Sequence, residues 1–272
     1  MYLAHWNLKR RPFRNVPDTR FFFHSATHDA ALAELLYTID ESLGAALLVG
    51  PFGSGKSLVL RALLNGLSQV GHYRTGLLTN ALMSGAEVVL GAARALGASD
   101  LPERAADVSE SYAQDRLEQR LVALNSTGVR AVLAIDDAQV IASPGTWQAL
   151  RLMLGIQLGE RAPLTLILAG SEELLRRIEG APGFAERVGV RTALAPLPEE
   201  DALDYLLHRL ACAGAGRGIF TRQAAQNIVR LAGGLPARIN QLADLALAAA
   251  FGLGLAVVGP EVVDMVASEM SR

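Results

Sequence analysis

A glycine-rich loop that ends in a lysine and a hydroxyl residue is the stretch of this chain best suited to chemistry. The residues Gly50-Pro51-Phe52-Gly53-Ser54-Gly55-Lys56-Ser57 fit the spacing G-x-x-x-x-G-K-[ST] and directly follow the apolar run Ala45–Val49. Glycines let the backbone aim several N–H groups at phosphate oxygens, and a helix from Leu58 onward adds its positive N-terminal end. The strand before the loop and the amphipathic stretch Leu58–Leu67 after it disfavour the alternative of a simple strand-to-helix turn. The pattern therefore predicts that residues 50–58 bind a nucleotide.

Three side chains near this loop predict the use of ATP and Mg²⁺. Lys56 is placed to reach the β- and γ-phosphates, and Ser57 offers a hydroxyl to Mg²⁺. Asp136 follows the buried run Val132–Ile135, which is the position of a Walker B aspartate that holds Mg²⁺ through water. A carboxylate that only ends the strand is the alternative for Asp136. We expect Ser57 and Asp136 to hold the metal.

Asp137 takes the position at which hydrolytic relatives usually carry glutamate to orient and deprotonate the attacking water. Aspartate is one methylene shorter, and positioning is most of what this chemistry needs. The sequence thus predicts ATP hydrolysis that is slow or that uses a bridging water.

Apolar runs alternate with helical patterns through the middle of the chain, which predicts a parallel sheet covered on both faces. A ligand is expected at the carboxyl ends of the strands, where Gly50, Asp136 and Gly170 fall. Besides Ala45–Val49, the expected strands are Tyr73–Thr79, Arg130–Ile135, Leu164–Ala169 and Val190–Leu194, and the expected helices are His28–Leu43, Leu58–Leu67, Ala86–Leu96, Asp107–Leu124, Thr146–Leu158 and Glu172–Ile178.

The two ends of the chain differ from this middle part. Residues 1–27 mix aromatic and basic residues with prolines, which predicts an irregular strap near the nucleotide. Its phenylalanines are either a wall beside the adenine base or core residues; they are Phe13, Phe21, Phe22 and Phe23. Residues 198–272 predict a helical lid, with helices Glu199–Ala211, Thr221–Leu231, Pro236–Phe251 and Pro260–Met270. Residues 28–197 form the expected α/β nucleotide-binding domain.

Composition limits the cellular setting. The chain has 272 residues, with Lys+Arg 25 against Asp+Glu 27, so its net charge of -2 shows no global basic field for nucleic acid. Cys212 is the only cysteine, which excludes an intramolecular disulfide and fits a reducing compartment. We expect no signal peptide, and because Asp244 interrupts the apolar run Leu242–Val258, we also expect no membrane span. The sequence predicts a cytoplasmic protein.

Motifs along nearly the whole chain resemble the AAA+ ATPases, and among them the general secretion pathway protein A family, which is related to transposition ATPases of the TniB and TnsC type. Besides the phosphate loop, the motifs are Met1-Tyr2-Leu3, Arg11-Pro12-Phe13 with Pro17-Asp18, Ile135-Asp136-Asp137-Ala138-Gln139, Leu168-Ala169-Gly170, Leu194-Ala195-Pro196-Leu197, and Gly233-Gly234-Leu235-Pro236 with Ile239-Asn240.

The resemblance implies a P-loop core with a helical lid, and it implies roles for further residues. Ser171 takes the sensor 1 position, where members often have glutamine. Arg187 matches the arginine that similar proteins supply across a subunit boundary, with Arg191 as the substitute. The sensor 2 arginine of the family directly follows the lid proline; here Ala237 stands there and Arg238 follows, so we assign Arg238.

These observations predict a homo-oligomeric Mg-ATPase that binds ATP between its core and lid, couples nucleotide state to assembly, and works with a protein partner in secretion or the cell envelope. One alternative is an ATP-dependent DNA-binding ATPase that uses basic residues such as Lys9-Arg10-Arg11 with Arg14, or Arg74. Another is an ATP-gated scaffold with weak hydrolysis.

Overall fold

The chain folds into two compact units. The computed structural model describes residues 2–79, 81–102, 108–159, 162–216 and 218–270. The sheet unit comprises Asp29–Pro51 and Lys56–Leu194, and the helical unit comprises Met1–His28, Phe52–Gly55 and Ala195–Arg272. The predicted phosphate loop therefore has residues in both units. The domain boundaries expected after residues 27 and 197 stay a prediction.

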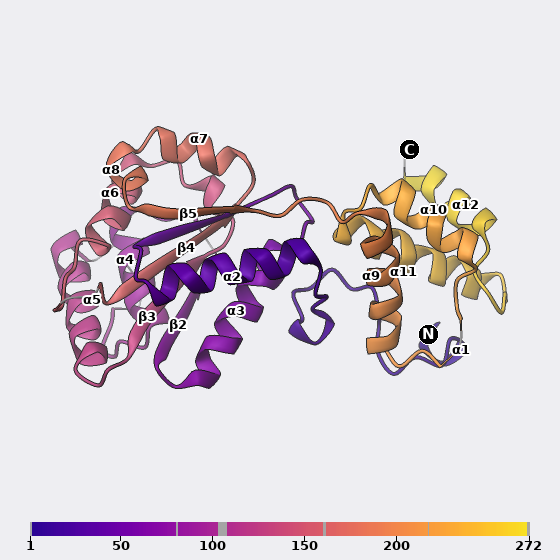
Figure 1. Ribbon diagram of the computed structural model, residues 1–272, viewed down its shortest axis with the longest axis horizontal. Coiled ribbons are helices and arrows are strands. Elements are labelled where there is room, and N and C mark those ends of the chain that lie inside the picture. Colours follow the sequence, from indigo (N-terminus) through magenta and orange to yellow (C-terminus); the bar gives the residue numbers. More distant parts are fainter. Residues whose placement is uncertain (1, 80, 103–107, 160–161, 217, 271–272) are drawn as a thin grey trace. The chain divides into compact units, whose positions relative to one another are not determined.

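The sheet unit is built on a parallel sheet, which over the described residues has five strands in the order β2-β3-β4-β1-β5 (Figure 1). All residues of β1 and β4 are buried, and so are all but the first of β3. Such continuous burial is typical of a parallel sheet with both faces covered. The predicted α/β fold is confirmed. The strands are β1 Ala45–Val49, β2 Tyr73–Leu78, β3 Arg130–Ile135, β4 Leu164–Gly170 and β5 Val188–Ala193.

Helices connect the strands and cover the sheet (Figure 1). Ser84 and Glu87 form a capping box at the start of α4, and Ser109 caps α5 by accepting from the Tyr112 N–H, so both helices begin at side chains that satisfy their first amides. The elements are α2 Ala26–Asp40, α3 Lys56–Val70, α4 Gly85–Ala95, α5 Glu110–Asn125, the 3-10 helix η3 Ala138–Val140, α6 Pro144–Met153, α7 Glu173–Glu179 and α8 Pro182–Ala185.

The helices differ from the sequence-based expectation mainly at their ends, and short helices were missed. Helix α6 ends at Met153, five residues before the expected end, because the chain turns at Gly155, whose N–H bonds the Leu152 carbonyl. The short helix α8, with Pro182 in its first turn, was not predicted. Helix α5 begins at Glu110, and residue 107, where we expected its start, lies outside the described residues.

The helical unit contains α9 Glu199–Cys212, α10 Arg222–Ala232, α11 Pro236–Gly252 and α12 Pro260–Met270. The predicted N-cap at Thr221 is confirmed, since its side chain accepts from the Ala224 N–H. Pro236 and Pro260 begin their helices, where a missing N–H costs nothing. The predicted helical C-terminal region is therefore present.

The N-terminal strap packs into the helical unit. The strap was expected to be irregular, but it contains a short helix, α1 Tyr2–His5, and a 3-10 helix, η1 Thr19–Phe21; between these two it is irregular. Trp6, Phe13 and Phe21 are buried in one apolar cluster with residues of all four long helices. Phe13 and Phe21 are thus core residues of this unit, which is one of the two alternatives that the sequence left open.

A buried arginine fixes the strap. Arg209 of α9 is 4% exposed, and its guanidinium donates to the Pro12 carbonyl at 2.6 Å, the Arg14 carbonyl at 3.0 Å and the Tyr205 hydroxyl at 3.1 Å. It also lies over the Phe21 ring, 4.4 Å from the centroid. Carbonyl groups and aromatic rings therefore take the place of a carboxylate partner for this buried charge.

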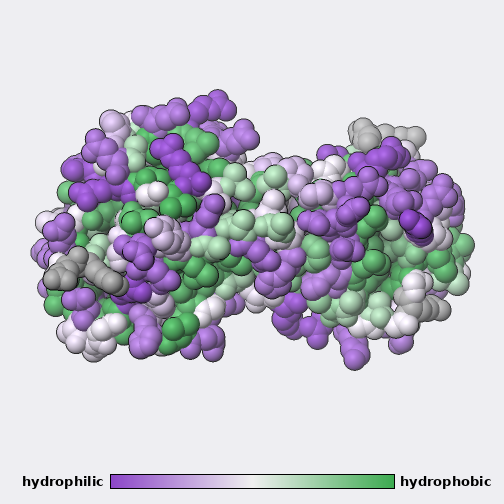
Figure 2. Space-filling model, in the orientation of Figure 1, coloured by the Kyte–Doolittle hydropathy of each residue, from purple (hydrophilic) through white to green (hydrophobic). Residues whose placement is uncertain are grey.

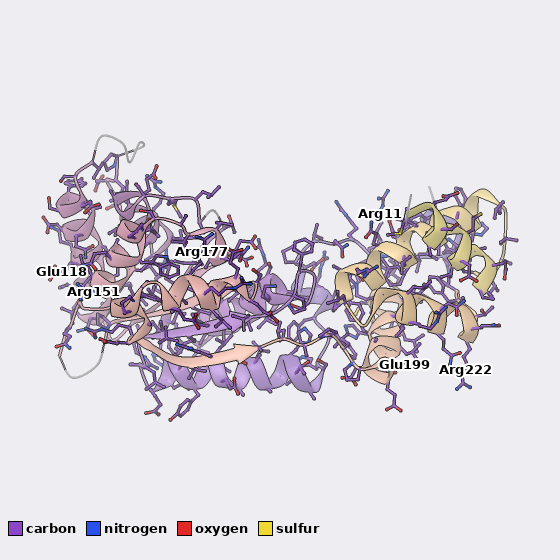
Figure 3. All side chains as sticks on the ribbon, turned by 90° about the horizontal axis from the view of Figure 1, so that it is seen from above. Arg11, Glu118, Arg151, Arg177, Glu199 and Arg222 are labelled. Atoms are coloured by element: carbon purple, nitrogen blue, oxygen red, sulfur yellow. The ribbon has the colours of Figure 1, made fainter. Side chains whose placement is uncertain are left out.

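In the view drawn, neither unit has a large face of hydrophobic residues alone or of hydrophilic residues alone, because the two kinds alternate over the surface (Figure 2). Charged side chains such as Arg11, Glu118 and Arg222 project from the ribbon at the periphery of the units (Figure 3). Among the described residues, no helix has the length and apolar character that a membrane crossing needs.

Candidate functional site

The sheet brings three predicted site residues to one edge. Strand β4 lies between β3 and β1, so Asp136, Ser171 and Gly50 follow the carboxyl ends of three neighbouring strands. The Gly50 N–H extends the pairing of β1 with β4 by donating to the Gly170 carbonyl at 3.2 Å. Open parallel sheets bind ligands at this edge.

The phosphate loop connects β1 to α3 as predicted. Phe52 at its tip is 91% exposed, whereas Ser54 is fully buried. Gly55 has a φ of +103°, and a Cβ there would lie 3.0 Å from Nε2 of His28, so this position needs glycine both for its backbone angle and for the close histidine. Lys56 and Ser57 begin α3, with Leu58 in its first turn, so the loop ends at the N-terminus of a helix.

Lys56 is mostly buried, at 9% exposure. Its ammonium donates to the Gly50 carbonyl at 2.8 Å and to the Pro51 carbonyl at 2.9 Å, which holds it inside the loop. Burial lowers the pKa of Lys56, while Asp136 and Asp137 act in the opposite direction. The ammonium is therefore positioned by the loop in an environment where added negative charge from phosphates favours its protonated form.

The two aspartates after β3 differ in exposure and backbone. Asp136 is 9% exposed, and its Oδ1 accepts from the Asp137 N–H at 3.0 Å. Asp137 is exposed and has a φ of 52°, in the left-handed region that few non-glycine residues adopt. Asp136 is therefore buried at the end of the strand, whereas Asp137, in the left-handed turn, is exposed.

Gln139 links Asp137 to Ser171, a role that the sequence analysis missed. Its Nε2 donates to Oδ1 of Asp137 at 3.2 Å, and its Oε1 accepts from the Ser171 N–H at 3.2 Å. A Cβ on Gly170 would lie 2.6 Å from Oε1, so the strand end leaves room for the carboxamide. The signal was present, because Gln139 ends the motif that contains both aspartates.

Two of the predicted arginines, Arg187 and Arg191, do not lie at the carboxyl edge of the sheet. Arg187 is exposed between α8 and β5, and its carbonyl accepts from the Ala45 N–H, so it lies at the amino ends of the strands. Arg191 is exposed within β5, opposite Leu47. Arg238 is exposed in the first turn of α11, in the helical unit. The roles assigned to these arginines and to Ser171 stay predictions.

The oxygen donors at the site suit Mg²⁺ better than a softer metal. Mg²⁺ binds proteins through one or two oxygen ligands and keeps several waters, which the Ser57 hydroxyl and the Asp136 carboxylate fit. In the described part of the chain, no cluster of three or more histidine, cysteine or acidic residues forms a metal site of its own. Any metal here would depend on phosphate oxygens as well.

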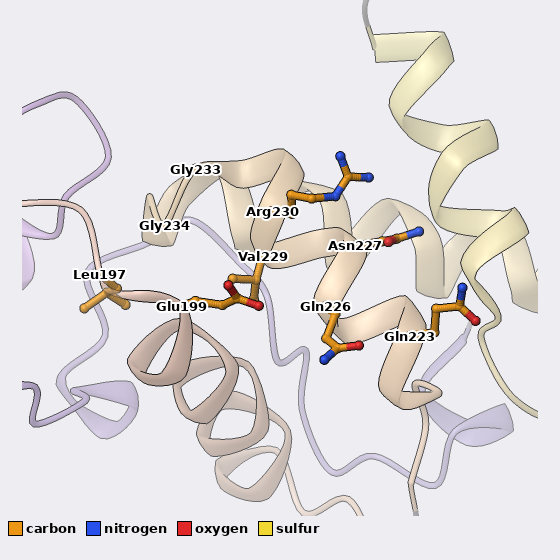
Figure 4. Close-up of a pocket in the computed structure, with 9 residues that line it drawn as sticks. All are labelled: Leu197, Glu199, Gln223, Gln226, Asn227, Val229, Arg230, Gly233 and Gly234. Atoms are coloured by element: carbon orange, nitrogen blue, oxygen red, sulfur yellow. The ribbon is translucent and has the colours of Figure 1, made fainter.

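The helical unit carries a separate open pocket of about 510 Å³ (Figure 4). It lies between the start of α9 and one side of α10, and the Gly233-Gly234 turn and Leu197 close one end, where the Leu197 N–H bonds the Gly234 carbonyl at 2.9 Å. Polar side chains dominate the α10 side. The lining residues are Leu197, Glu199, Gln223, Gln226, Asn227, Val229, Arg230, Gly233 and Gly234.

Comparison with known proteins agrees with the geometry. The family described as "AAA domain" matches residues 38–178. General secretion pathway protein A of Aeromonas hydrophila is 32% identical over 256 residues, which is 93% of this chain and 46% of that protein, so the chain spans about half the length of this relative.

Solved structures show the same fold over nearly the whole chain. The Aeropyrum pernix ORC2 protein, in a structure of ADPNP and ADP complexes, has a TM-score of 0.74 at 15% identity, covering 96% of this chain and 71% of that one. Drosophila ORC bound to DNA has a TM-score of 0.75 at 15% identity, covering all of this chain and 66% of the other. With the phosphate loop, Asp136 and the parallel sheet in place, this chain belongs to the AAA domain family and is an AAA+ ATPase similar to general secretion pathway protein A.

Proposed function

We propose that this protein is a cytoplasmic Mg-ATPase whose nucleotide state controls its assembly into a homo-oligomer, and that it serves the assembly of secretion or cell-envelope machinery. The observation that carries the oligomeric part is the place of Arg187, at the end of the sheet opposite the phosphate loop.

The separation of Arg187 from its own loop follows from strand geometry. Ala45 pairs with Val188 and Val49 with Ala193, so the length of a strand lies between Arg187 and Gly50. At about 3.3 Å per residue this is roughly 16 to 20 Å, well beyond the reach of one side chain. An arginine finger at this position therefore acts on the ATP of a neighbouring subunit, where such a residue contributes about 10³ to 10⁵ in rate.

In this proposal, each residue of the phosphate loop and of the strand ends has its own role in ATP hydrolysis. Lys56 binds the β- and γ-phosphates, and Ser57 with Asp136 holds Mg²⁺, which supplies charge neutralisation on the phosphates when bound. Asp137 orients the attacking water and takes its proton, and Ser171 lies at the end of the neighbouring strand to contact the same water or the γ-phosphate. Hydrolysis then removes the charge that Arg187 binds and loosens the subunit contact.

The proposed process rests on the relative from Aeromonas hydrophila, whose name is general secretion pathway protein A. This chain spans about half of that protein. We infer that its partner is a protein of the envelope or of the secretion machinery.

Light scattering tests the oligomeric proposal. We expect the mass to rise to a defined multiple of the monomer with Mg²⁺ and a slowly hydrolysed ATP analogue, and not with Mg-ADP. Arg187→Ala should bind ATP normally but lose most of its turnover, while Arg222→Ala, at an exposed arginine of α10 with no assigned role, serves as the control. A monomer in both nucleotide states would contradict a site shared between subunits.

DNA binding is a second candidate function. The exposed side chains Lys9, Arg10, Arg11 and Arg14 gather on the strap, and one structural neighbour is an ORC bound to DNA. If these four cations contact phosphates, the slope of log K against log salt is about -3.6. A gel shift of duplex DNA at two salt concentrations, with the parent and a variant carrying alanine at the four positions, tests this candidate.

The third candidate, an ATP-gated scaffold, rests on the short carboxylate of Asp137. A turnover assay separates it from the other two, since a scaffold would assemble with ATP while hydrolysing almost none of it.

A further inference from the structure

Two consecutive carbonyl groups of the phosphate loop are held by other parts of the helical unit. The Gly53 carbonyl accepts from the Ala237 N–H at 3.1 Å, and the Ser54 carbonyl lies 3.1 Å from Nε2 of His28. A carbonyl oxygen only accepts, so Nε2 of His28 carries the hydrogen. Because His28 is 7% exposed and Ser54 fully buried, water does not compete for this contact.

The direction of these carbonyls sets the direction of two amides. In a trans peptide the C=O and the following N–H point to opposite sides. Holding the Gly53 carbonyl therefore turns the Ser54 N–H away from Ala237, and holding the Ser54 carbonyl turns the Gly55 N–H away from His28. These amides belong to the stretch whose N–H groups a phosphate-binding loop aims at its ligand.

Ser25 holds the imidazole of His28 in this orientation. Its Oγ lies 2.7 Å from Nδ1, and it also lies 3.4 Å from the His28 N–H in the first turn of α2. With Nε2 protonated, Nδ1 of a neutral imidazole accepts the Ser25 hydroxyl hydrogen. The Phe22 ring meets the imidazole edge to face, with centroids 6.3 Å apart. Both ring nitrogens therefore have hydrogen-bond partners, and the Phe22 ring lies nearby.

Ala237 is held from the other side by the strap. Nδ2 of Asn15 donates to the Ala237 carbonyl at 3.0 Å, and Oδ1 of Asn15 accepts from Asn240 at 2.9 Å. A Cβ on Gly53 would lie 2.7 Å from the Ala237 Cβ, so the loop backbone and the start of α11 are in close contact at a residue with a φ of +83°. Strap residues thus lie behind both carbonyl contacts.

We propose that His28 is a positioning residue of the ATPase: by holding the Ser54 carbonyl, it orients the loop amides for phosphate binding without touching the nucleotide. Ser25 sets the imidazole, and Asn15 with Ala237 supports the adjoining peptide. The role belongs to nucleotide binding itself and is independent of oligomeric state and of the cellular process.

The decisive variant is His28→Phe, which keeps a buried ring and removes the donor. We expect its Kd for a fluorescent ADP analogue and its KM for ATP to rise about tenfold, as for one lost hydrogen bond to a loop that must then order on binding. The kcat should stay within about threefold, because the chemical groups are unchanged. His28→Gln, whose amide nitrogen offers a donor at a similar distance from the backbone, should restore the Kd to within about threefold of the parent.

His72→Phe is the matched control, since His72 is exposed on the loop before β2, and it should bind as the parent does. If His28→Phe does not fold, Ser25→Ala retains the imidazole and should weaken ADP binding about threefold. Parent-like Kd values for both His28→Phe and Ser25→Ala would overturn the proposal. It would also be overturned if His28→Gln lost binding and melting temperature as much as His28→Phe, because His28 would then act by packing alone.

Discussion

Replacing Gln139 is the sharpest test of how the strand ends cooperate in hydrolysis. Gln139→Ala removes the hydrogen bond to the Asp137 carboxylate and the one from the Ser171 N–H, both 3.2 Å long. A hydrogen bond to a charged group contributes about 1.5 to 3 kcal/mol, and a neutral one about 1 kcal/mol. If Asp137 needs this support only while the water is activated, kcat falls about 10- to 100-fold, since about 1.4 kcal/mol is a factor of ten.

The second variant, Gln139→Glu, keeps the size and the acceptor for the Ser171 N–H but places a second carboxylate about 3.2 Å from Asp137. Two carboxylates at this distance repel each other when both are ionised, so the pair binds a proton more tightly than Asp137 does alone. If Asp137 is the base, the acid side of the kcat–pH profile should move to higher pH, and activity should recover partly as the pH rises. A purely structural role for Gln139 would not move this profile.

The assay is steady-state ATP turnover from pH 5.5 to 9, with ADP binding measured in parallel. Gln148 lies exposed on α6 and accepts only from Arg151 among the hydrogen bonds described, so Gln148→Ala and Gln148→Glu are matched controls. We expect the Gln139 variants to bind ADP within about twofold of the parent. The reasoning is refuted if Gln139→Ala keeps the parent kcat, or if Gln139→Glu lowers kcat with an unchanged pH profile.

Three further results are expected. Lys56→Ala should weaken ATP binding at least about tenfold in a fluorescence titration, because the loop loses the cation that it positions for the phosphates; parent-like binding would remove the basis for the site. Arg209→Leu leaves the Pro12 and Arg14 carbonyls without their donor and should lower the free energy of unfolding by about 3 to 5 kcal/mol. The measurements are the melting temperature, which should fall, and trypsin cleavage in the strap, which should become faster. Unchanged cleavage would show that the strap is held by its aromatic residues alone. Burial lowers the pKa of the His208 imidazole more than its backbone hydrogen bond raises it, so the folded protein favours the neutral form over the cation. The stability that the neutral form contributes should be fully present above about pH 6.5 and should decrease as the pH falls. His208→Gln should therefore flatten the dependence of melting temperature on pH between about 7.5 and 5.5.

The strands and the chemistry at their ends were readable from the sequence because they are local. The phosphate loop needs glycines, a lysine and a hydroxyl within eight positions, and the run before Asp136 is apolar at every position because both of its faces are covered. Helix starts at Thr221, Pro236 and Pro260 were also predictable, since capping depends on one or two neighbouring residues.

Only the tertiary structure decided which distant residues meet. Arg209 contacts the Pro12 carbonyl 197 positions away, and nothing in the local sequence of either residue encodes that pair. The same holds for His28 with Ser54 and for Gln139 with Ser171, where the partners are set by how α2 and the ends of β3 and β4 are placed. Sequence alone therefore determined that this chain has the groups for ATP chemistry. The tertiary structure decided which side chains hold those groups in position, because hydrogen bonds depend on distances and directions that only the folded chain fixes.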